Sequence, residues 1–254
     1  MHFLVLACES LSRPVQHFAA QSPHRVEVEL IPRSLHQPAE IRTRLQQRLE
    51  AHAQDALDAI LLAYGLCGQA AAGLVVCTHP LVIPRTHDCI TLYLGSREAY
   101  TQEMQKEPGT YWYSQDYLEH SAGQSPALTL GVPTGEDPQA LYLKYVEKYG
   151  QAKADRLMQV MNGWLAHYQR AVYLDTGLGS DDPAQAAARQ AAAAHGWAFE
   201  RLPADLVLIQ RLLNGDWEDD FLVVPAGQEI AMSYDDEIVC ARLPEITGHS
   251  GAGP

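Results

Sequence analysis

The chain has 254 residues, of which 47% are hydrophobic and 19% are charged, so it can form one large or two small hydrophobic cores, and global disorder is excluded. Its net charge of -13 and the lack of any Lys/Arg run argue against nucleic acid or a membrane surface as partner. Binding to phosphate groups needs concentrated positive charge. We therefore expect a small-molecule substrate, with a protein partner or a homo-oligomer as a further option.

The amino terminus enters an apolar strand pattern at once and has no basic segment followed by a long apolar leader. No apolar run has the length needed to span a bilayer. Five cysteines make an odd count in a chain too large to need disulfide staples. These features predict a cytoplasmic protein whose cysteines serve thiol or metal chemistry.

The first half of the chain alternates between strand and helix patterns. Buried or half-buried strands are expected at 3–8, 26–32, 59–65 and 81–85, with a helix whose apolar face carries Ile41, Leu45 and Leu49. Asp88 is expected to cap a further helix over 90–104, which Gly95 and Ser96 can interrupt.

A Pro- and Gly-containing segment at about 107–138 reads as a long loop or lid with a short helix. Apolar spacings over 139–168 predict two helices that separate near Gly150. The pattern then returns to strand, helix and strand, with strands at 171–175, 197–202 and 221–225. Pro183 near the start of the intervening helix and Gly196 after it are typical of helix ends.

The two halves have the same order of strand, helix and strand, which predicts an α/β fold of two Rossmann-like units with mainly parallel sheets and a cleft between them. The expected domains are residues 1–138, which carry the cysteines and an aromatic loop, and residues 139–254, which carry the bridging helices and the second unit.

Three cysteines fall just beyond the expected carboxyl ends of strands, namely Cys8, Cys67 and Cys89. In an open α/β sheet these ends form the ligand crevice, so the three thiols can meet if their strands are neighbours in one sheet. Together with His87 they form a Cys3His set, which suits zinc, while three thiolates alone suit an iron–sulfur cluster. Buried cysteines that act as small hydrophobes are the alternative. Cys77 and Cys240 are not expected to be ligands.

Other residues near these cysteines have candidate roles. Asp88 and Arg85 are candidate catalytic groups, with a helix cap and a surface ion pair as their structural alternatives. Gly65 and Gly68 flank Cys67 and allow its loop to approach a bound cofactor closely. His87 can ligate the metal, act as a base for one cysteine or cap the strand. Tyr111 and Trp112 can line a cofactor pocket or cover the edge of the core.

The sequence resembles an uncharacterised family of bacteria and archaea, domain of unknown function 1638. The segments that carry the resemblance are AC at 7–8, ILLAYGLCG at 60–68, LVIPRTHDCITLYLGSRE at 81–98, GTYW at 109–112, YLDTG at 173–177 and GDWEDDFLVVPAG at 215–227. The family has no established activity to carry over. Some members are encoded near corrinoid-dependent methyl-transfer genes, so the resemblance implies an association with methyltransferases.

Three classes of function follow from the residues. The first is a soluble metal-binding protein with a zinc ion or iron–sulfur cluster, which acts on a small molecule in methyl-transfer or one-carbon metabolism. The second is a metal-free enzyme with Cys89 as nucleophile. The third is a noncatalytic binding or metallocentre-assembly protein. Whether the protein is an enzyme stays open at this stage.

Overall fold

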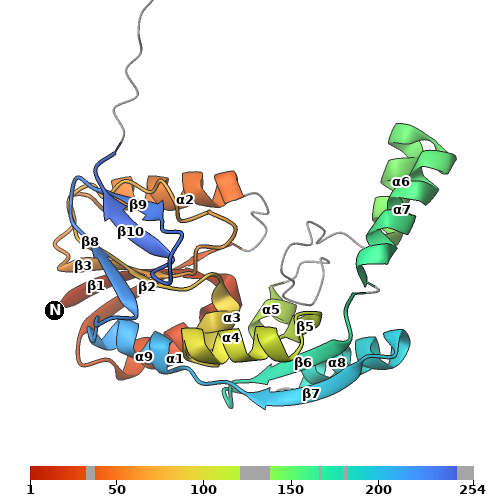
Figure 1. The fold of residues 1–254 in the computed structure, drawn as a ribbon. Helices are drawn as coiled ribbons and strands as arrows, with labels where there is room; N and C mark the ends of the chain where they lie inside the picture. Colours follow the sequence, from red (N-terminus) through yellow and green to blue (C-terminus); the bar gives the residue numbers. More distant parts are fainter. Residues whose placement is uncertain (33–37, 121–137, 166, 180–181, 245–254) are drawn as a thin grey trace, which may run out of the picture.

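The computed structural model describes residues 1–32, 38–120, 138–165, 167–179 and 182–244, which form a mixed α/β fold (Figure 1). The α/β class predicted from the alternating strand and helix patterns is confirmed. No helix within these described ranges combines the length and the apolar character needed to cross a bilayer.

The larger sheet has five strands in the order β2-β1-β3-β4-β8. The first four strands along the chain pair in parallel, and β8 is antiparallel to β4. Their bounds are His2–Cys8 (β1), Arg25–Ile31 (β2), Ala59–Ala63 (β3), Leu81–Pro84 (β4) and Phe221–Val224 (β8). Both faces of β1 are buried, which explains why its sequence is a continuous apolar run rather than an alternating one.

The smaller sheet has three parallel strands in the order β5-β6-β7. Its strands are Thr110–Tyr113 (β5), Arg170–Asp175 (β6) and Ala198–Pro203 (β7). A separate antiparallel pair is formed by Glu229–Met232 (β9) and Val239–Arg242 (β10). Each sheet therefore contains strand-helix-strand connections of the predicted kind, such as β1-α1-β2 in the larger sheet and β6-α8-β7 in the smaller one.

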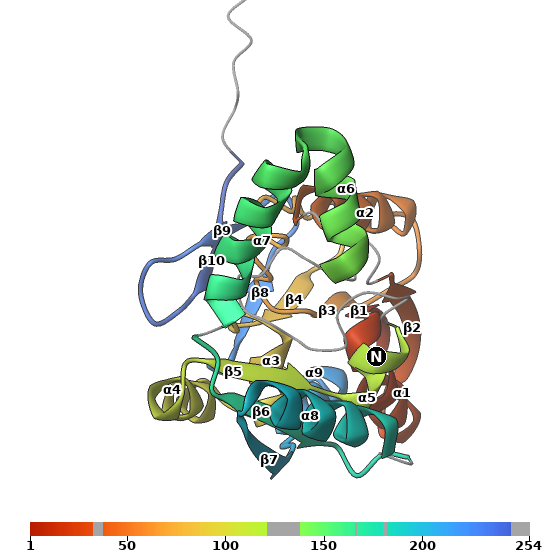
Figure 2. The same ribbon diagram turned by 90° about the vertical axis from the view of Figure 1, so that its right-hand side faces the viewer.

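The helices connect the strands and, with a short 3-10 turn, lie mostly in layers against the sheets. Their bounds are Glu9–Leu11 (η1, the 3-10 turn), Ser12–Gln21 (α1), Pro38–Ala51 (α2), Cys89–Leu94 (α3), Arg97–Lys106 (α4), Gln115–Glu119 (α5), Pro138–Tyr149 (α6), Gln151–Leu165 (α7), Asp182–His195 (α8) and Val207–Asn214 (α9). The predicted helix break near Gly95 and the two helices that separate at Gly150 are confirmed. The α6–α7 hairpin projects from the rest of the molecule (Figures 1 and 2).

The two sheets share one hydrophobic core. Phe3 and Val5 of β1 belong to the same buried cluster as Trp112 of β5 and Val172 of β6. Side chains of α1, α3 and α9 complete this cluster between the sheets. Helix α2 and the β9–β10 pair cover the opposite face of the larger sheet, and α8 covers the opposite face of the smaller one.

Strands from both sides of residue 138 take part in each sheet. Strand β5 from the first half pairs with β6, and β8 from the second half pairs with β4. The division predicted at residue 138 is therefore not a division between sheets. Helix α9 explains the return of the chain to the larger sheet, because Leu208, Ile209 and Leu212 are buried in the shared core. The expectation that 221–225 would extend the second sheet is wrong.

The segment expected to be a loop at 107–138 contains regular structure in its described part. Its aromatic residues form β5, and Ser114 caps α5 by accepting a hydrogen bond from the Tyr117 N–H at 3.2 Å. Residues 121–137 of the expected lid lie outside the described residues. Strand β5 has only four residues, and a pattern of that length does not distinguish a strand from a loop.

Arg170 provides a stability prediction, because its side chain is only 5% exposed and bonds Glu103 at 2.6 Å, Glu200 at 3.0 Å and Thr110 at 3.0 Å. Arg170→Ala removes a buried cation from the half-buried Glu103 and Glu200, and we expect it to reduce the free energy of unfolding by about 3 kcal/mol, the lower end of the cost of breaking a buried pair. Arg201, half exposed and paired with Asp175, is the control, and its alanine variant should lose less than about 1 kcal/mol. Urea unfolding of both variants measures this. Equal losses would contradict the assignment of Arg170 as a buried anchor.

Candidate functional site

The three predicted cysteines lie at one edge of the larger sheet. Strands β1, β3 and β4 are parallel neighbours, so their carboxyl ends are aligned, as the prediction required. Cys8 is the last residue of β1, Cys67 lies in the loop after β3, and Cys89 begins α3 after β4. The three positions lie at one edge because β1, β3 and β4 run in the same direction, with helices α1 and α2 in the connections from β1 to β3 and an irregular segment between β3 and β4.

The loop that carries Cys67 has an unusual backbone. Cys67, Gly68 and Gln69 all have positive φ, of 47°, 62° and 75°. Side chains disfavour this conformation, so such positions persist where the surrounding structure holds them, and they cluster at functional sites. The Cys67 N–H donates to the His87 carbonyl at 2.8 Å and fixes this loop to the loop before α3. The sequence predicted that Gly68 gives its loop conformational freedom, and the positive φ of Gly68 agrees with that prediction.

Gly65 meets a different demand, because its backbone packs directly on the loop that carries Cys89. A Cβ atom on Gly65 would lie 2.5 Å from the Cα of Asp88 and 2.6 Å from its nitrogen. Only glycine permits two backbones to approach this closely. Gly65 therefore supports the site by bringing together the loops after β3 and β4.

The three thiols are close enough for each to affect the ionisation of the others. Burial raises the pKa of Cys89 well above its usual value, and the charges of Cys67 and Cys8 raise it further. Burial raises the pKa of Cys67 in the same way, followed by the charges of Cys8 and Asp88. We call Cys8, Cys67 and Cys89 the thiol cluster. Each of its members is a half-buried residue.

Polar groups around the thiol cluster donate hydrogen bonds to its sulfur atoms. The Ser10 hydroxyl donates to Cys8 Sγ at 3.0 Å. The backbone of Gly65 and of Cys89 hydrogen bonds the Cys67 sulfur. These bonds favour thiolates and so oppose the effect of burial.

Tyr64 adds a further contact, since its buried side chain hydrogen bonds Cys8. Burial raises the pKa of Tyr64 well above its usual value, and the charges of Cys8 and Cys67 raise it further. Sequence reasoning missed Ser10 and Tyr64. Their one signal is position, because each lies within three residues of a cysteine at a strand end.

Asp88 caps α3, as predicted. Its Oδ1 accepts from the N–H groups of Ile90 at 2.9 Å and Thr91 at 3.3 Å. Burial raises its pKa, while these N–H groups lower it. The cap occupies one carboxylate oxygen and orients Cys89 at the first position of the helix, so Asp88 acts on the site through the backbone and through its charge.

Arg85 and His87 point to other neighbours. Arg85 donates to the Val239 carbonyl at 2.6 Å and pairs with Glu237 at 2.8 Å, so it ties β4 to the β9–β10 pair. The exposed His87 ring packs near Tyr100 and lines a cavity of about 540 Å³ beside α4 and the β9–β10 turn. The contacts described for these two side chains are thus with the β9–β10 pair and with Tyr100.

Tyr111 and Trp112 lie on opposite faces of β5. Trp112 is fully buried in the shared core, where the Arg170 guanidinium lies 5.5 Å from its ring. Tyr111 stacks on Trp197 with ring centroids 5.0 Å apart on the face toward α8. These contacts are those of the structural alternative, in which the two aromatic side chains cover the edge of the core.

The thiol cluster has three sulfur donors, at the end of β1, in the loop after β3 and at the start of α3, and this is the donor chemistry that a thiophilic metal ion prefers. No group of three or more His, Cys, Asp or Glu side chains within the described ranges is arranged to hold a metal as these side chains stand. Cys77 is exposed in a loop and Cys240 lies in β10, so neither belongs to the thiol cluster.

Fold and site together define a mixed α/β protein with a cysteine cluster at the carboxyl ends of parallel strands. Residues 30–213 match the family model described as protein of unknown function, DUF1638. The chain therefore belongs to that family, as the sequence motifs predicted. The match includes Cys67 and Cys89, and Cys8 precedes it. No curated protein and no solved structure matches the chain.

Proposed function

We propose that the protein is a soluble metal-binding protein in which Cys8, Cys67 and Cys89 hold a zinc ion or an iron–sulfur cluster that acts on a small molecule. The observation that carries the proposal is the placement of the three cysteines at the aligned carboxyl ends of the parallel strands β1, β3 and β4. Three partly buried thiolates repel one another, and a divalent cation would remove that repulsion.

The thiol cluster supplies three ligands, so a fourth position on the metal would remain for His87 or for the substrate. Zinc with an open position activates a bound thiol as its thiolate, which suits alkyl or methyl transfer. This links the proposal to the methyl-transfer or one-carbon reaction that the family resemblance suggested. The free state of all five cysteines supports a reducing compartment, and we place the protein in the cytoplasm.

The metal-free alternative, with Cys89 as nucleophile, is less well supported. A nucleophilic cysteine needs a lowered pKa, whereas burial and the neighbouring charges raise the pKa of Cys89. The third possibility, a metallocentre-assembly protein, would use the same cysteine ligands. It would pass the metal to another protein, whereas the protein of the leading proposal retains it.

Anaerobic purification followed by elemental analysis and a visible spectrum tests the proposal. One zinc per chain without colour supports a tetrahedral site, and iron with sulfide and a charge-transfer band supports a cluster. Transfer of the metal to an acceptor protein would favour the assembly role. A chain that takes up neither metal during anaerobic reconstitution would refute metal binding.

Metal binding should release protons, which is a prediction that follows from the raised pKa values of Cys67 and Cys89. At neutral pH these thiols are protonated without metal and must become thiolates to ligate it. We expect about two protons or more per zinc at about pH 7, and weaker binding as the pH falls. Zinc titration in weak buffer with a pH indicator measures the release. Binding without proton release would mean that the ligands are not these thiols.

A further inference from the structure

The α6–α7 hairpin is a unit of its own that projects from the two sheets (Figures 1 and 2). Its helices are joined to each other, because Tyr142 of α6 donates to Asp155 of α7 at 2.8 Å and Ala154 is fully buried. In the part of the chain that the structure describes, no side chain of the hairpin belongs to the three hydrophobic clusters of the body. The hairpin is therefore not needed to close those cores.

The hairpin presents large apolar side chains to solvent. Leu143 is 60% exposed and Tyr149 is 44% exposed. A cavity of about 520 Å³ opens on the hairpin, and we call it the hairpin cavity. Its lining residues come from both helices and are Tyr145, Tyr149, Lys153, Arg156 and Leu157. Cavities of roughly 300–1,000 Å³ hold drug-sized ligands, so this one has room for an aromatic side chain.

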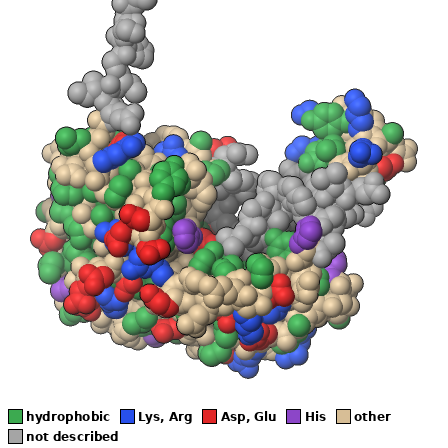
Figure 3. Space-filling model, in the orientation of Figure 1, with side chains coloured by type: hydrophobic (Ala, Val, Ile, Leu, Met, Phe, Trp, Pro, Cys, Tyr) green, Lys and Arg blue, Asp and Glu red, His purple; other side chains and the backbone are tan. Residues whose placement is uncertain are grey.

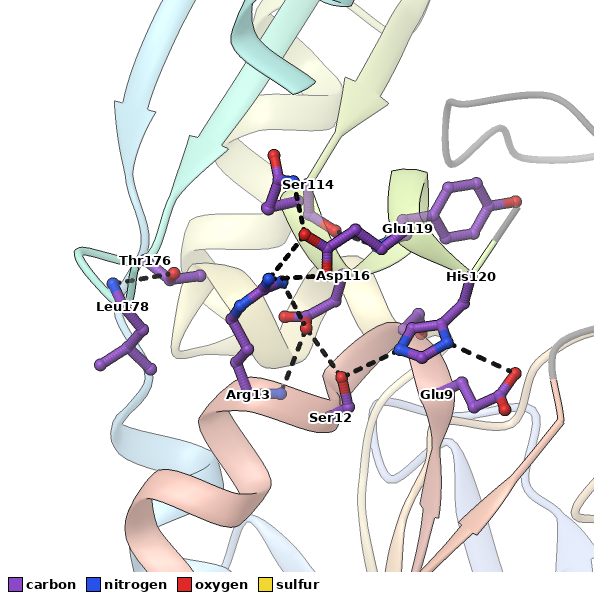
Figure 4. Close-up of polar contacts among 12 residues, drawn as sticks. Glu9, Ser12, Arg13, Ser114, Asp116, Glu119, His120, Thr176 and Leu178 are labelled. Carbon is purple, nitrogen blue, oxygen red and sulfur yellow. Dashed lines mark hydrogen bonds and ion pairs between the residues drawn. The ribbon is translucent and has the colours of Figure 1, made fainter. Parts of the chain in front are cut away.

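The hairpin is basic in an acidic protein. Residues 138–165 contain four Lys or Arg and two Asp or Glu, whereas the whole chain has a net charge of -13. Cations elsewhere are commonly paired within the chain, as Arg13 of α1 is with two carboxylates of α5 (Figure 4). Lys153 and Arg156 have no hydrogen bond or ion pair among the described residues. Basic and hydrophobic side chains thus share the exposed surface of the hairpin (Figure 3).

The turn between β9 and β10 has the complementary character. Tyr234 in this turn is 96% exposed, the highest fraction among the large apolar side chains that the structure describes. The acidic residues Asp235, Asp236 and Glu237 follow it directly. An aromatic ring beside carboxylates matches a cavity that is lined by tyrosine, leucine and unpaired cations.

The turn is held rigidly although its aromatic ring is free. Arg97 donates to the Asp236 carbonyl at 2.5 Å, and Arg85 donates to the Glu237 carbonyl at 3.2 Å. Ile238 keeps a positive φ of 65°, which a β-branched residue adopts only where its surroundings impose it. A ring on a preorganised turn loses little backbone entropy when it binds, and tyrosine is enriched among the residues that dominate protein interfaces.

The hairpin cavity and the β9–β10 turn lie on opposite sides of the molecule, so one chain cannot fill its own cavity (Figure 1). We propose that Tyr234 of one copy enters the hairpin cavity of a second copy, with Asp236 beside Lys153 and Arg156. A second copy fits because every chain carries both complementary surfaces. Reciprocal exchange of the two contacts closes a two-fold dimer, the commonest homo-oligomer. The inference does not depend on metal binding.

Sedimentation of the full chain at low ionic strength, from about 1 to about 100 µM, tests the dimer. The wild type should dimerise in this range. Tyr234→Ser should weaken dimerisation at least about tenfold without affecting the fold, because the side chain has almost no contacts within its own chain. Salt should also weaken it, since the Debye length falls from about 30 Å at 0.01 M to about 8 Å at 0.15 M.

A charge exchange tests which two surfaces meet. Arg156→Glu and Asp236→Lys each place like charges at the contact, so each variant alone should dimerise at least about tenfold more weakly. Mixed in equal amounts, the two variants should recover the affinity of the wild type. The mixed dimer has one wild-type contact and one contact in which the two charges are exchanged. Misfolded variants would not recover on mixing.

Val207→Ser is the control, because it removes an exposed apolar side chain of α9 and should dimerise as the wild type does. A larger assembly that Tyr234→Ser dissociates would also support the inference. A wild type that stays monomeric overturns it and leaves a different protein as the occupant of the hairpin cavity. A dimer that Tyr234→Ser and Arg156→Glu leave unchanged, or variants that do not recover on mixing, also overturns it.

Discussion

Replacement of Cys8, Cys67 or Cys89 with serine, one at a time, is expected to remove most of the bound metal. A neutral hydroxyl cannot replace a thiolate as ligand to zinc or iron, and the loss of one of three protein ligands exposes the ion to water. Metal content per chain after anaerobic reconstitution and desalting is the measurement. We expect the affinity to fall at least about 100-fold, the upper range seen for removal of supporting contacts.

Cys77→Ser and Cys240→Ser are the matched controls, because they remove a thiol without touching the thiol cluster. Both should keep the metal content of the wild type. Circular dichroism and thermal unfolding show whether each variant is folded. Equal metal content in all five serine variants would reject the thiol cluster as the binding site.

The loss caused by Cys8→Ser has a particular meaning, since Cys8 lies before the residues that match the family model. Its sulfur interacts with Cys67, Cys89 and Tyr64 through space. If Cys8→Ser keeps its metal while the other two variants lose it, the site has two cysteine ligands and Cys8 is a neighbour. The proposed three-ligand site would then be wrong.

The sequence predicted the edge of the sheet at which the cysteines meet but not the groups around them. Cys8, Cys67 and Cys89 each follow an apolar run, and the alignment of parallel strands brings such positions together. Ser10 and Tyr64 carry no comparable signal, because their only mark in the sequence is that each lies within three residues of a cysteine. His87 is close to Cys89 in sequence, yet its side chain faces the cavity beside α4.

The topology was harder to predict than the elements. Residues 221–225 read as a strand and form β8, yet their partner is β4 rather than β6 or β7. Strand pairing depends on where α9 packs, and its apolar residues fit the shared core as well as they would fit a second independent one. Periodicity within a segment carries no information on that choice.

The second large effect is expected for Gly65→Ala, which should both destabilise the fold and disrupt the thiol cluster. The added Cβ would lie within 2.5 to 2.8 Å of three backbone atoms of Asp88, and backbone cannot move aside as a flexible side chain can. We expect a loss of about 3 kcal/mol in the free energy of unfolding, at the upper end of the usual cost of overpacking. The displaced loop carries Cys89, so metal affinity should fall with stability.

Gly68→Ala separates this close approach from conformational strain. Gly68 has a φ of 62°, but a Cβ there meets only Pro38 Cγ at 3.6 Å, an ordinary contact. The variant should lose about 1 to 2 kcal/mol from the left-handed conformation and retain its metal. Urea unfolding and metal content of the two variants give the comparison. If Gly65→Ala binds metal as tightly as Gly68→Ala, the contact between the loops after β3 and β4 does not hold the thiols together.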